Sequence, residues 1–153
     1  MDATFTTNSA DQTSALAKQL AAHLSGTDVI ELIGDLGAGK TQFVRGLAAG
    51  VASEDQVQSP SFMLQRMYNG TPYNIHHFDF YRLQEPGVIA MELVESLEDP
   101  QALVVIEWAE SVADVLPAEK ITIRIDTISD QQRQLTITGL PATAVKELHD
   151  FND

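Results

Sequence analysis

The sequence predicts an α/β fold in which a mixed, mainly parallel central sheet is flanked by helices and extended by an antiparallel hairpin. Apolar runs of strand length alternate along the chain with segments of helical periodicity. A glycine-rich loop follows the first of these runs and leads directly into a helix. With 44% hydrophobic and 20% charged residues among 153, we expect residues 1–153 to form one domain around one core.

The first third of the chain is expected to contain a helix, a strand and a second helix. Ser9, followed three residues later by Gln12, resembles a capping box, so the first helix should begin there. Leucines then recur every fourth residue until the stop signal Ser25–Gly26. Residues 29–33 form a buried strand, and residues 41–49 are helical with their apolar side chains on one side.

A hairpin and a central strand are expected in the middle of the chain. Residues 61–68 and 73–80 are rich in aromatic and branched side chains and flank Asn69–Gly70, a strong hairpin signal. Residues 88–97 predict a helix whose glutamates face solvent. The continuous apolar run 102–106 is typical of a parallel strand that is covered on both faces.

The last third predicts a pair of antiparallel strands. After the break at Leu116–Pro117, apolar and polar residues alternate over 121–126 and again around 135–137. The polar turn 129–132 separates the two strands. The final dozen residues form either a short helix or a frayed tail.

Composition narrows the classes of function. The formal net charge of −13 repels phosphate backbones, so any role with nucleic acid should be played through partner proteins, unless the charge serves solubility alone. The chain has no cysteine, which removes thiolate chemistry and cysteine-type zinc sites. We see no signal peptide, lipidation motif or membrane span, so we expect a cytoplasmic protein.

The segment 34–41 matches the phosphate-loop pattern G-x-x-x-x-G-K-[ST] in full, and it lies between a predicted strand and a predicted helix. Glycines let the backbone amides curl around phosphate oxygens, and the helix presents its positive end to them. Lys40 can reach the β- and γ-phosphates, and the Thr41 hydroxyl can bind magnesium. We therefore predict a P-loop NTPase whose nucleotide contacts are Asp35, Leu36, Gly37, Ala38, Gly39, Lys40, Thr41 and Gln42.

Two carboxylates are candidates for magnesium and water. Glu107 ends the apolar run 103–106, which is the form of a Walker B element, and there it can hold magnesium together with Thr41. The alternative for Glu107 is a surface glutamate at a strand end. Asp79 follows a second strand and can orient the attacking water or touch magnesium through a water. We predict Asp79, Glu107 and Lys40 as the catalytic residues.

Other polar and aromatic residues near these strands admit more than one interpretation each. Trp108, the sole tryptophan, can pack on the nucleotide or be an ordinary core aromatic. The adjacent His76 and His77 should point to opposite faces of their strand, which argues against a metal pair and favours a structural role for His77. Ser61, or Ser59, can sense the γ-phosphate or lie in a plain turn. Arg82 can bind a carboxylate, a phosphate or a partner.

Four motifs in the same order resemble the TsaE (YjeE) family, the bacterial ATPases needed for threonylcarbamoyladenosine in tRNA. The motifs are Gly-Asp-Leu-Gly-Ala-Gly-Lys-Thr at 34–41, Ser-Pro-Ser-Phe at 59–62, His-Phe-Asp-Phe-Tyr-Arg at 77–82 and Ile-Glu-Trp at 106–108. The resemblance covers nearly the whole chain. Ser61 stands where the family usually has threonine, which keeps the hydroxyl and loses a methyl group.

The resemblance implies slow hydrolysis of ATP by the protein alone and action with the proteins TsaB and TsaD, of which TsaD modifies tRNA. It implies that Thr41 and Glu107 bind magnesium and that Asp79 and Trp108 lie at the nucleotide site. It also implies that Thr13 lies in a region that helps to enclose the nucleotide. Because the chain is acidic, we expect no tight contact with tRNA itself.

Two other functions remain open at the level of sequence. A small-molecule kinase needs a lid with several arginines, and nine Lys plus Arg residues spread along the chain argue against one. A nucleotide-switched binding module with negligible turnover cannot be separated from a slow hydrolase by its residues. The absence of an Asn-Lys-x-Asp run mildly favours ATP over GTP.

Overall fold

The computed structural model describes residues 2–35, 37–57, 65–81 and 87–149. These ranges contain seven strands, most of them separated by helices. The strands are β1 (Asp2–Thr7), β2 (Val29–Ile33), β3 (Gln65–Tyr68), β4 (Asn74–Asp79), β5 (Ala102–Glu107), β6 (Ile121–Thr127) and β7 (Arg133–Thr138). The helices are α1 (Ala10–Ala21), α2 (Lys40–Gly50), α3 (Gly87–Glu98), the 3₁₀ segment η2 (Ala109–Val115) and α4 (Ala142–His149). No helix among these residues is long and apolar enough to cross a membrane.

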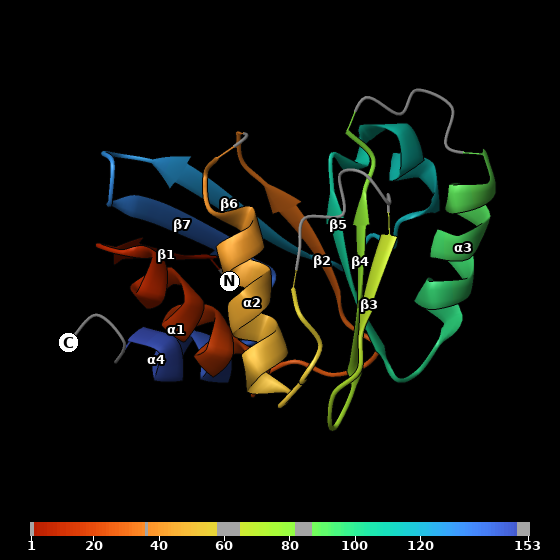
Figure 1. Cartoon of the computed structure of the whole chain (residues 1–153), viewed down its shortest axis with the longest axis horizontal. Helices are drawn as coiled ribbons and strands as arrows, with labels where there is room; N and C mark the ends of the chain where they lie inside the picture. The colour runs from red at the N-terminus through yellow and green to blue at the C-terminus, as the bar shows by residue number, and fades with distance from the viewer. Residues whose placement is uncertain (1, 36, 58–64, 82–86, 150–153) are drawn as a thin grey trace.

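The strands form one mixed sheet in the order β1-β7-β6-β2-β5-β4-β3. The four central strands β6, β2, β5 and β4 run parallel, whereas β3, β7 and β1 pair antiparallel at the two sides. Helices α1 and α2 cover one face of the sheet, and α3 packs on the other face beyond β4 and β3 (Figure 1). The predicted α/β class, with its parallel centre and hairpin extension, is confirmed.

Strand β5 lies inside the sheet between β2 and β4, and its side chains are buried on both faces. Leu103 and Val105 join the core beneath α1 and α2, and Val104 and Ile106 join the core beneath α3 and η2. A strand surrounded in this way has no polar face, which explains its continuous apolar sequence.

The predicted start of α1 is confirmed, and its predicted end is wrong. Ser9 Oγ accepts a hydrogen bond from the amide of Gln12, and Gln12 Oε1 accepts one from the amide of Asn8. The helix ends at Ala21, because Ala22 and the two residues after it form single turns instead of continuing the helical hydrogen bonds.

Two features of the sheet were not predicted. Strand β1 is an edge strand whose six residues alternate between exposed and buried, but only Ala3 and Phe5 among them are apolar, so the alternation does not stand out in the sequence. The β3–β4 connection is longer than the two-residue turn that Asn69–Gly70 predicts, since Tyr68 pairs with Ile75. Pro72 lies within the connection and cannot donate a ladder hydrogen bond.

Helices α1 and α2 approach closely at Gly46. A Cβ atom added there would overlap the carbonyl oxygen of Ser14 and lie 2.7 Å from Cβ of Ala17. We therefore expect Gly46→Ala to lower the free energy of unfolding by about 2 kcal/mol, because the two helices must separate. Urea denaturation checks this, with Ala49→Ser on the exposed side of α2 as a control that should change stability by less than about 0.5 kcal/mol.

Tyr73 joins the β3–β4 connection to α1, since its buried hydroxyl donates a hydrogen bond of 2.7 Å to the carbonyl oxygen of Ala21. Burial, reinforced by the charge of Asp28, raises the pKa of Tyr73 from 10.0 to about 12. The tyrosine of the unfolded chain ionises near pH 10, whereas in the folded protein it ionises only near pH 12. The free energy of unfolding therefore falls as the pH rises from about 10 to about 12. In Tyr73→Phe we expect this alkaline loss, measured by thermal unfolding against pH, to be smaller than in the wild type.

Candidate functional site

The phosphate loop leaves β2 at Ile33 and enters α2 at Lys40. Gly37 and Gly39 adopt φ values of 83° and 106°, which L side chains rarely adopt, so both positions favour glycine. Between them the buried Ala38 donates its amide to the carbonyl oxygen of Asp35, at 3.0 Å. The loop thus bends back onto the start of α2, where backbone amides and the helix end favour an anion.

Lys40 connects the loop to the neighbouring strand. Its side chain is buried, and Nζ donates a hydrogen bond of 2.7 Å to the carbonyl oxygen of Gly34. The same atom lies 3.3 Å from Oε1 of Glu107 and 4.7 Å from the ring centroid of Trp108. The lysine is therefore held by a carbonyl, a carboxylate and an aromatic face at the place where the loop would hold phosphates.

Glu107 is a buried residue with two polar partners, Lys40 and His77, which excludes its interpretation as a surface glutamate. It is 4% exposed, and its Oε2 accepts a hydrogen bond of 2.5 Å from Nε2 of His77. Burial favours the neutral carboxyl, but His77 and Lys40 together outweigh it and hold the pKa of Glu107 below its usual range. The carboxylate is thus ionised at neutral pH, and His77 Nε2 must carry the proton that it donates.

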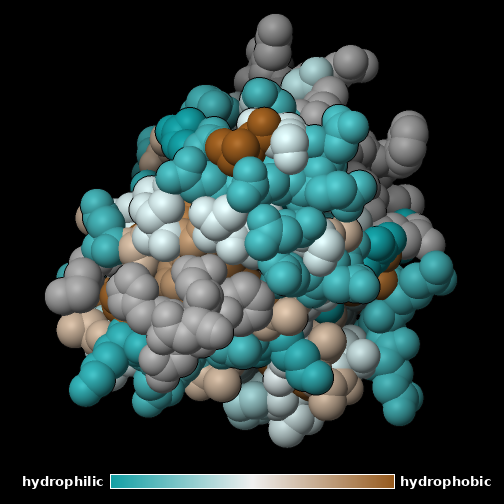
Figure 2. Space-filling view, turned by 90° about the vertical axis from the view of Figure 1, so that its left-hand side faces the viewer, coloured by the Kyte–Doolittle hydropathy of each residue, from teal (hydrophilic) through white to brown (hydrophobic). Residues whose placement is uncertain are grey.

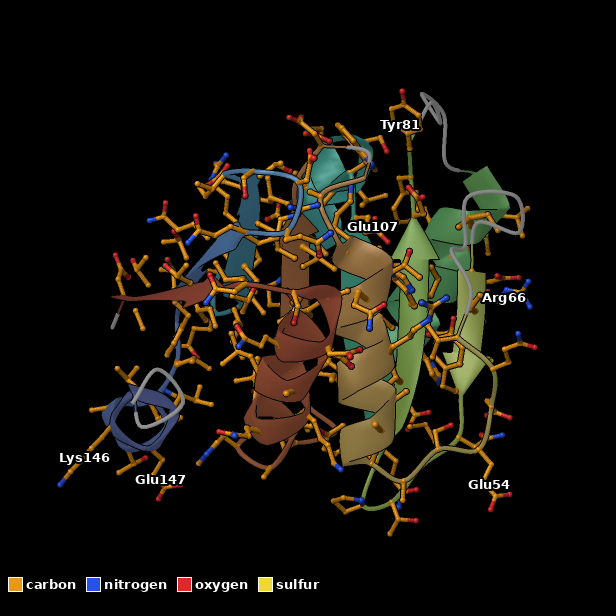
Figure 3. All side chains as sticks on the ribbon, turned by 60° about the vertical axis from the view of Figure 1, so that its left-hand side comes forward. Glu54, Arg66, Tyr81, Glu107, Lys146 and Glu147 are labelled. Carbon is orange, nitrogen blue, oxygen red and sulfur yellow. The ribbon has the colours of Figure 1, made fainter. Side chains whose placement is uncertain are left out.

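Asp79 lies directly beside Glu107 on the neighbouring parallel strand. The two residues are register partners at the carboxyl ends of β4 and β5, so their side chains share a face of the sheet. Asp79 is buried, and its Oδ1 accepts a hydrogen bond of 2.8 Å from the amide of Tyr81. Figure 3 shows Glu107 near the start of α2 and Tyr81 above the end of β4.

Trp108 lies beside the phosphate loop and is not a core aromatic. Its backbone has a left-handed φ of 56°, which turns the chain sharply after Glu107 into η2. The indole packs against the ring of Tyr81, with centroids 4.7 Å apart, and faces the ammonium of Lys40. A cavity of about 310 Å³ opens here, lined by Gly34, Lys40, Trp108, Glu31 and Arg124 among others.

The histidine pair separates as predicted. His77 lies on the face of the sheet that carries Asp79 and Glu107, whereas His76 lies on the opposite face and contacts Ser96 of α3 at 2.7 Å. His77 is fully buried, and no described residue hydrogen-bonds its Nδ1. Sequence reasoning favoured a structural role for His77, but the structure places it in contact with a candidate magnesium ligand.

Arg133, at the start of β7, is a site residue that the sequence did not reveal. Its Nε donates a hydrogen bond of 3.0 Å to the carbonyl oxygen of Ala38 in the phosphate loop. Its Nη1 donates to the carbonyl oxygens of Ser129, Asp130 and Gln132 in the β6–β7 turn. The guanidinium therefore connects the phosphate loop to the β6–β7 turn, and because Ala38 and Arg133 are 95 residues apart, no local motif signals this contact.

We expect Arg133→Gln to weaken Mg-ATP binding by about 3- to 10-fold, because one charge-assisted hydrogen bond that fixes the loop is lost. Isothermal titration calorimetry measures the change. Lys146→Gln, which removes the same charge from the exposed side of α4, is the matched control and should bind as the wild type does. Unchanged affinity in a folded Arg133→Gln protein would show that the loop keeps its conformation without the hydrogen bond from Arg133 to Ala38.

The side chains near the loop are suitable ligands for a magnesium ion. Thr41 at the start of α2 offers a hydroxyl, and Glu107 and Asp79 offer carboxylates, all hard oxygen donors. Within the described ranges no three His, Cys, Asp or Glu residues cluster as a metal site. A P-loop site does not need such a cluster, since magnesium there takes one or two protein ligands besides phosphates and waters.

The remaining predicted site residues have no described contact with Lys40 or Glu107. Asp35 is exposed at the start of the loop, and Gln42 Oε1 accepts a hydrogen bond of 3.0 Å from Arg45. Thr13 is buried in α1 and hydrogen-bonds to Thr7 at 2.7 Å, so its role at the nucleotide stays a prediction. The candidates outside the described residues are Leu36, Ser59, Ser61 and Arg82.

Known proteins resemble this chain in sequence and in fold. The model of the family described as "Threonylcarbamoyl adenosine biosynthesis protein TsaE" matches residues 7–135. The "tRNA threonylcarbamoyladenosine biosynthesis protein TsaE" of Bacillus subtilis (strain 168) is 35% identical over 130 residues, 85% of this chain and 81% of that protein. Its namesake in Streptomyces coelicolor is 36% identical over 136 residues, 82% of this chain and 88% of that protein. The crystal structure of Bacillus subtilis YdiB matches with a TM-score of 0.77 at 28% identity, covering 100% of this chain and 97% of that one.

Proposed function

Since the chain belongs to the TsaE family, we propose that it is a magnesium-dependent ATPase that supports a TsaB–TsaD complex in the threonylcarbamoyl modification of adenosine in tRNA. The observation that carries the ATPase proposal is the meeting of Lys40, Glu107 and Asp79 at the carboxyl edge of the sheet, beside the phosphate loop. Ligands of open α/β sheets bind at this edge.

In this proposal each residue of the site has a role in hydrolysis. The loop amides and Lys40 bind the β- and γ-phosphates and stabilise the charge that develops on the transferred group. Thr41 and Glu107 hold magnesium, which when bound neutralises phosphate charge, and His77 keeps the Glu107 carboxylate in place. Asp79 or Glu107 orients the attacking water.

The proposal includes partners, because the described cations beside the loop are Lys40, Arg124 and Arg133, and Arg133 is already bonded to backbone carbonyls. Arginine fingers contribute on the order of 10³- to 10⁵-fold to hydrolysis in P-loop enzymes, so we expect slow turnover until a partner completes the site. With a net charge of −13, the protein repels the tRNA backbone, and we propose that TsaB and TsaD make the contacts with tRNA.

Phosphate release from Mg-ATP tests the proposal, measured for the protein alone and after addition of purified TsaB and TsaD. Stimulation that is absent in Glu107→Gln would support both the chemistry and the pathway. No stimulation by partners shown to be active would contradict the partner proposal. Phosphate transfer to a metabolite panel would then favour a kinase, and nucleotide-dependent binding without phosphate release would favour a switch module.

A further inference from the structure

Helix α3 exposes apolar side chains on the side that faces away from the sheet. Val88 and Met91 are 69% and 67% exposed, and Val94 is 37% exposed. At helical spacing these three residues lie on one arc of the helix, which they share with the exposed Glu95 and Glu98, while Leu93 and Ser96 lie on the buried arc. Single exposed apolar residues are ordinary, but three on one arc of a twelve-residue helix make it a candidate interaction surface.

Beside this apolar arc lies an acidic groove between α3 and the edge strand β3. Its volume is about 420 Å³, and its lining residues are Gln65, Met67, His76, Glu92, Glu95, Ser96 and Asp99. The hydrogen bond of 2.7 Å between His76 and Ser96 joins β4 to α3 at the groove. Met67 of β3 is 56% exposed and adds an apolar side chain to the other wall.

Among the described residues, no ion pair balances the negative charge of the groove. None of the carboxylates of Glu92, Glu95 and Asp99 forms an ion pair with another described residue. Burial lowers the pKa of His76, against the opposing charge of Asp99, so this imidazole does not supply a balancing charge at neutral pH. In the part of the chain that the structure describes, no group of three His, Cys, Asp or Glu residues is arranged to hold a metal ion, and the groove is no exception. A Lys or Arg side chain of another protein would supply the opposite charge.

We propose that the groove and the exposed arc of α3 together form a docking surface for a protein segment that presents a cationic side chain flanked by apolar ones. The cation enters between Glu92, Glu95 and Asp99, and its apolar neighbours cover Val88 and Met91. A second copy of this chain fits poorly, because it would place one acidic groove against another in a protein of net charge −13.

The location of the surface supports a protein partner. Helix α3 forms one end of the molecule, with its outer side directed away from the sheet (Figure 1). The opposite end is mostly hydrophilic, and its hydrophobic atoms occur in small separate groups (Figure 2). The apolar stripe on α3 is therefore not a general property of this surface. Resting on the proposed function, we assign the docking segment to the TsaB–TsaD complex.

Biolayer interferometry with purified TsaB–TsaD tests the proposal on three double variants. Glu92→Lys with Glu95→Lys reverses the groove charge, and Val88→Ser with Met91→Ser makes the stripe polar. We expect each pair to weaken binding at least about 10-fold, the first most strongly at low salt. The matched control is Glu54→Lys with Glu147→Lys, two exposed glutamates away from α3, and we expect it to bind within about 2-fold of the wild type.

Basal ATP hydrolysis should stay unchanged in all three double variants, because every altered residue lies outside the nucleotide site. The thermal midpoint should stay unchanged in the groove and stripe variants, whereas the control variant loses the contact of 3.2 Å between Glu147 and His23. Equal binding by wild type, groove variant and stripe variant would overturn the docking surface while leaving the proposed function intact. No binding by the wild type would overturn the proposed partner and this occupant together. A wild-type dimer that the groove and stripe variants dissociate would assign the surface to a second copy and also overturn the proposal.

Discussion

Replacing Lys40 with alanine is expected to weaken Mg-ATP binding by at least about 100-fold while the protein stays folded. The ammonium group donates charge-assisted hydrogen bonds to phosphate oxygens, each of which contributes about 1.5–3 kcal/mol. In the structure its Nζ is already placed at the loop by Gly34 and Glu107, at 2.7 Å and 3.3 Å. Little side-chain reorganisation is therefore needed for it to meet a phosphate.

Isothermal titration calorimetry with Mg-ATP measures this loss, and circular dichroism checks the fold. Lys40→Ala removes one partner of Glu107 but leaves the hydrogen bond from His77, so we expect a lower unfolding midpoint and a native spectrum. If the alanine variant is unstable, Lys40→Met is measured in its place, because methionine keeps the approximate length of the side chain without its charge. Lys18→Ala, on the exposed side of α1, is the control. Micromolar binding by a folded Lys40→Ala protein would remove the phosphate-loop argument.

Replacing Glu107 with glutamine is expected to reduce hydrolysis by about 100-fold or more and to raise the magnesium concentration needed for half-maximal rate. Glutamine keeps the shape of the side chain and can still accept a hydrogen bond from His77, but it offers magnesium a neutral oxygen. Nucleotide affinity should change by less than about 10-fold, because Lys40 and the loop amides remain. The expected signature is thus a loss in kcat and in magnesium response with binding retained.

Phosphate release at graded magnesium concentrations measures this effect, with Mg-ATP affinity determined in parallel. Asp79→Asn is the matched comparison, since Asp79 is the register partner of Glu107 on β4. A loss of rate in Asp79→Asn without a change in magnesium response would assign the attacking water to Asp79. If Glu107→Gln hydrolysed ATP at the wild-type rate and magnesium dependence, neither a metal role nor a catalytic role for Glu107 would survive.

The core of the predicted site could be read from local sequence because it depends on short-range geometry. The segment 34–41 specifies its own turn, since glycine occupies the two positions with left-handed φ and the next residues begin a helix. Glu107 was predicted at a strand end from the apolar run before it, and the structure places it there. Its burial could not be predicted, because burial depends on which strands lie on either side.

The partners of these residues depend on strand order. His77 and Glu107 are 30 residues apart and meet only because β4 and β5 are parallel neighbours in the sheet. Arg133 reaches Ala38 because β7, β6 and β2 are successive strands, which brings the β6–β7 turn beside the phosphate loop. Alternating or apolar runs predict that a segment is a strand, but they do not state its neighbours.

The sequence by itself determined the order of helices and strands from α1 to β7 apart from η2, the phosphate loop and the family, because each follows from residue types at fixed spacing along the chain. The tertiary structure alone decided that Lys40, His77 and Glu107 contact one another, that Arg133 fastens the loop, and that α3 keeps apolar side chains exposed. Those contacts join residues from different elements, so they exist only after the elements pack, when burial and charge pairing select one arrangement of the sheet.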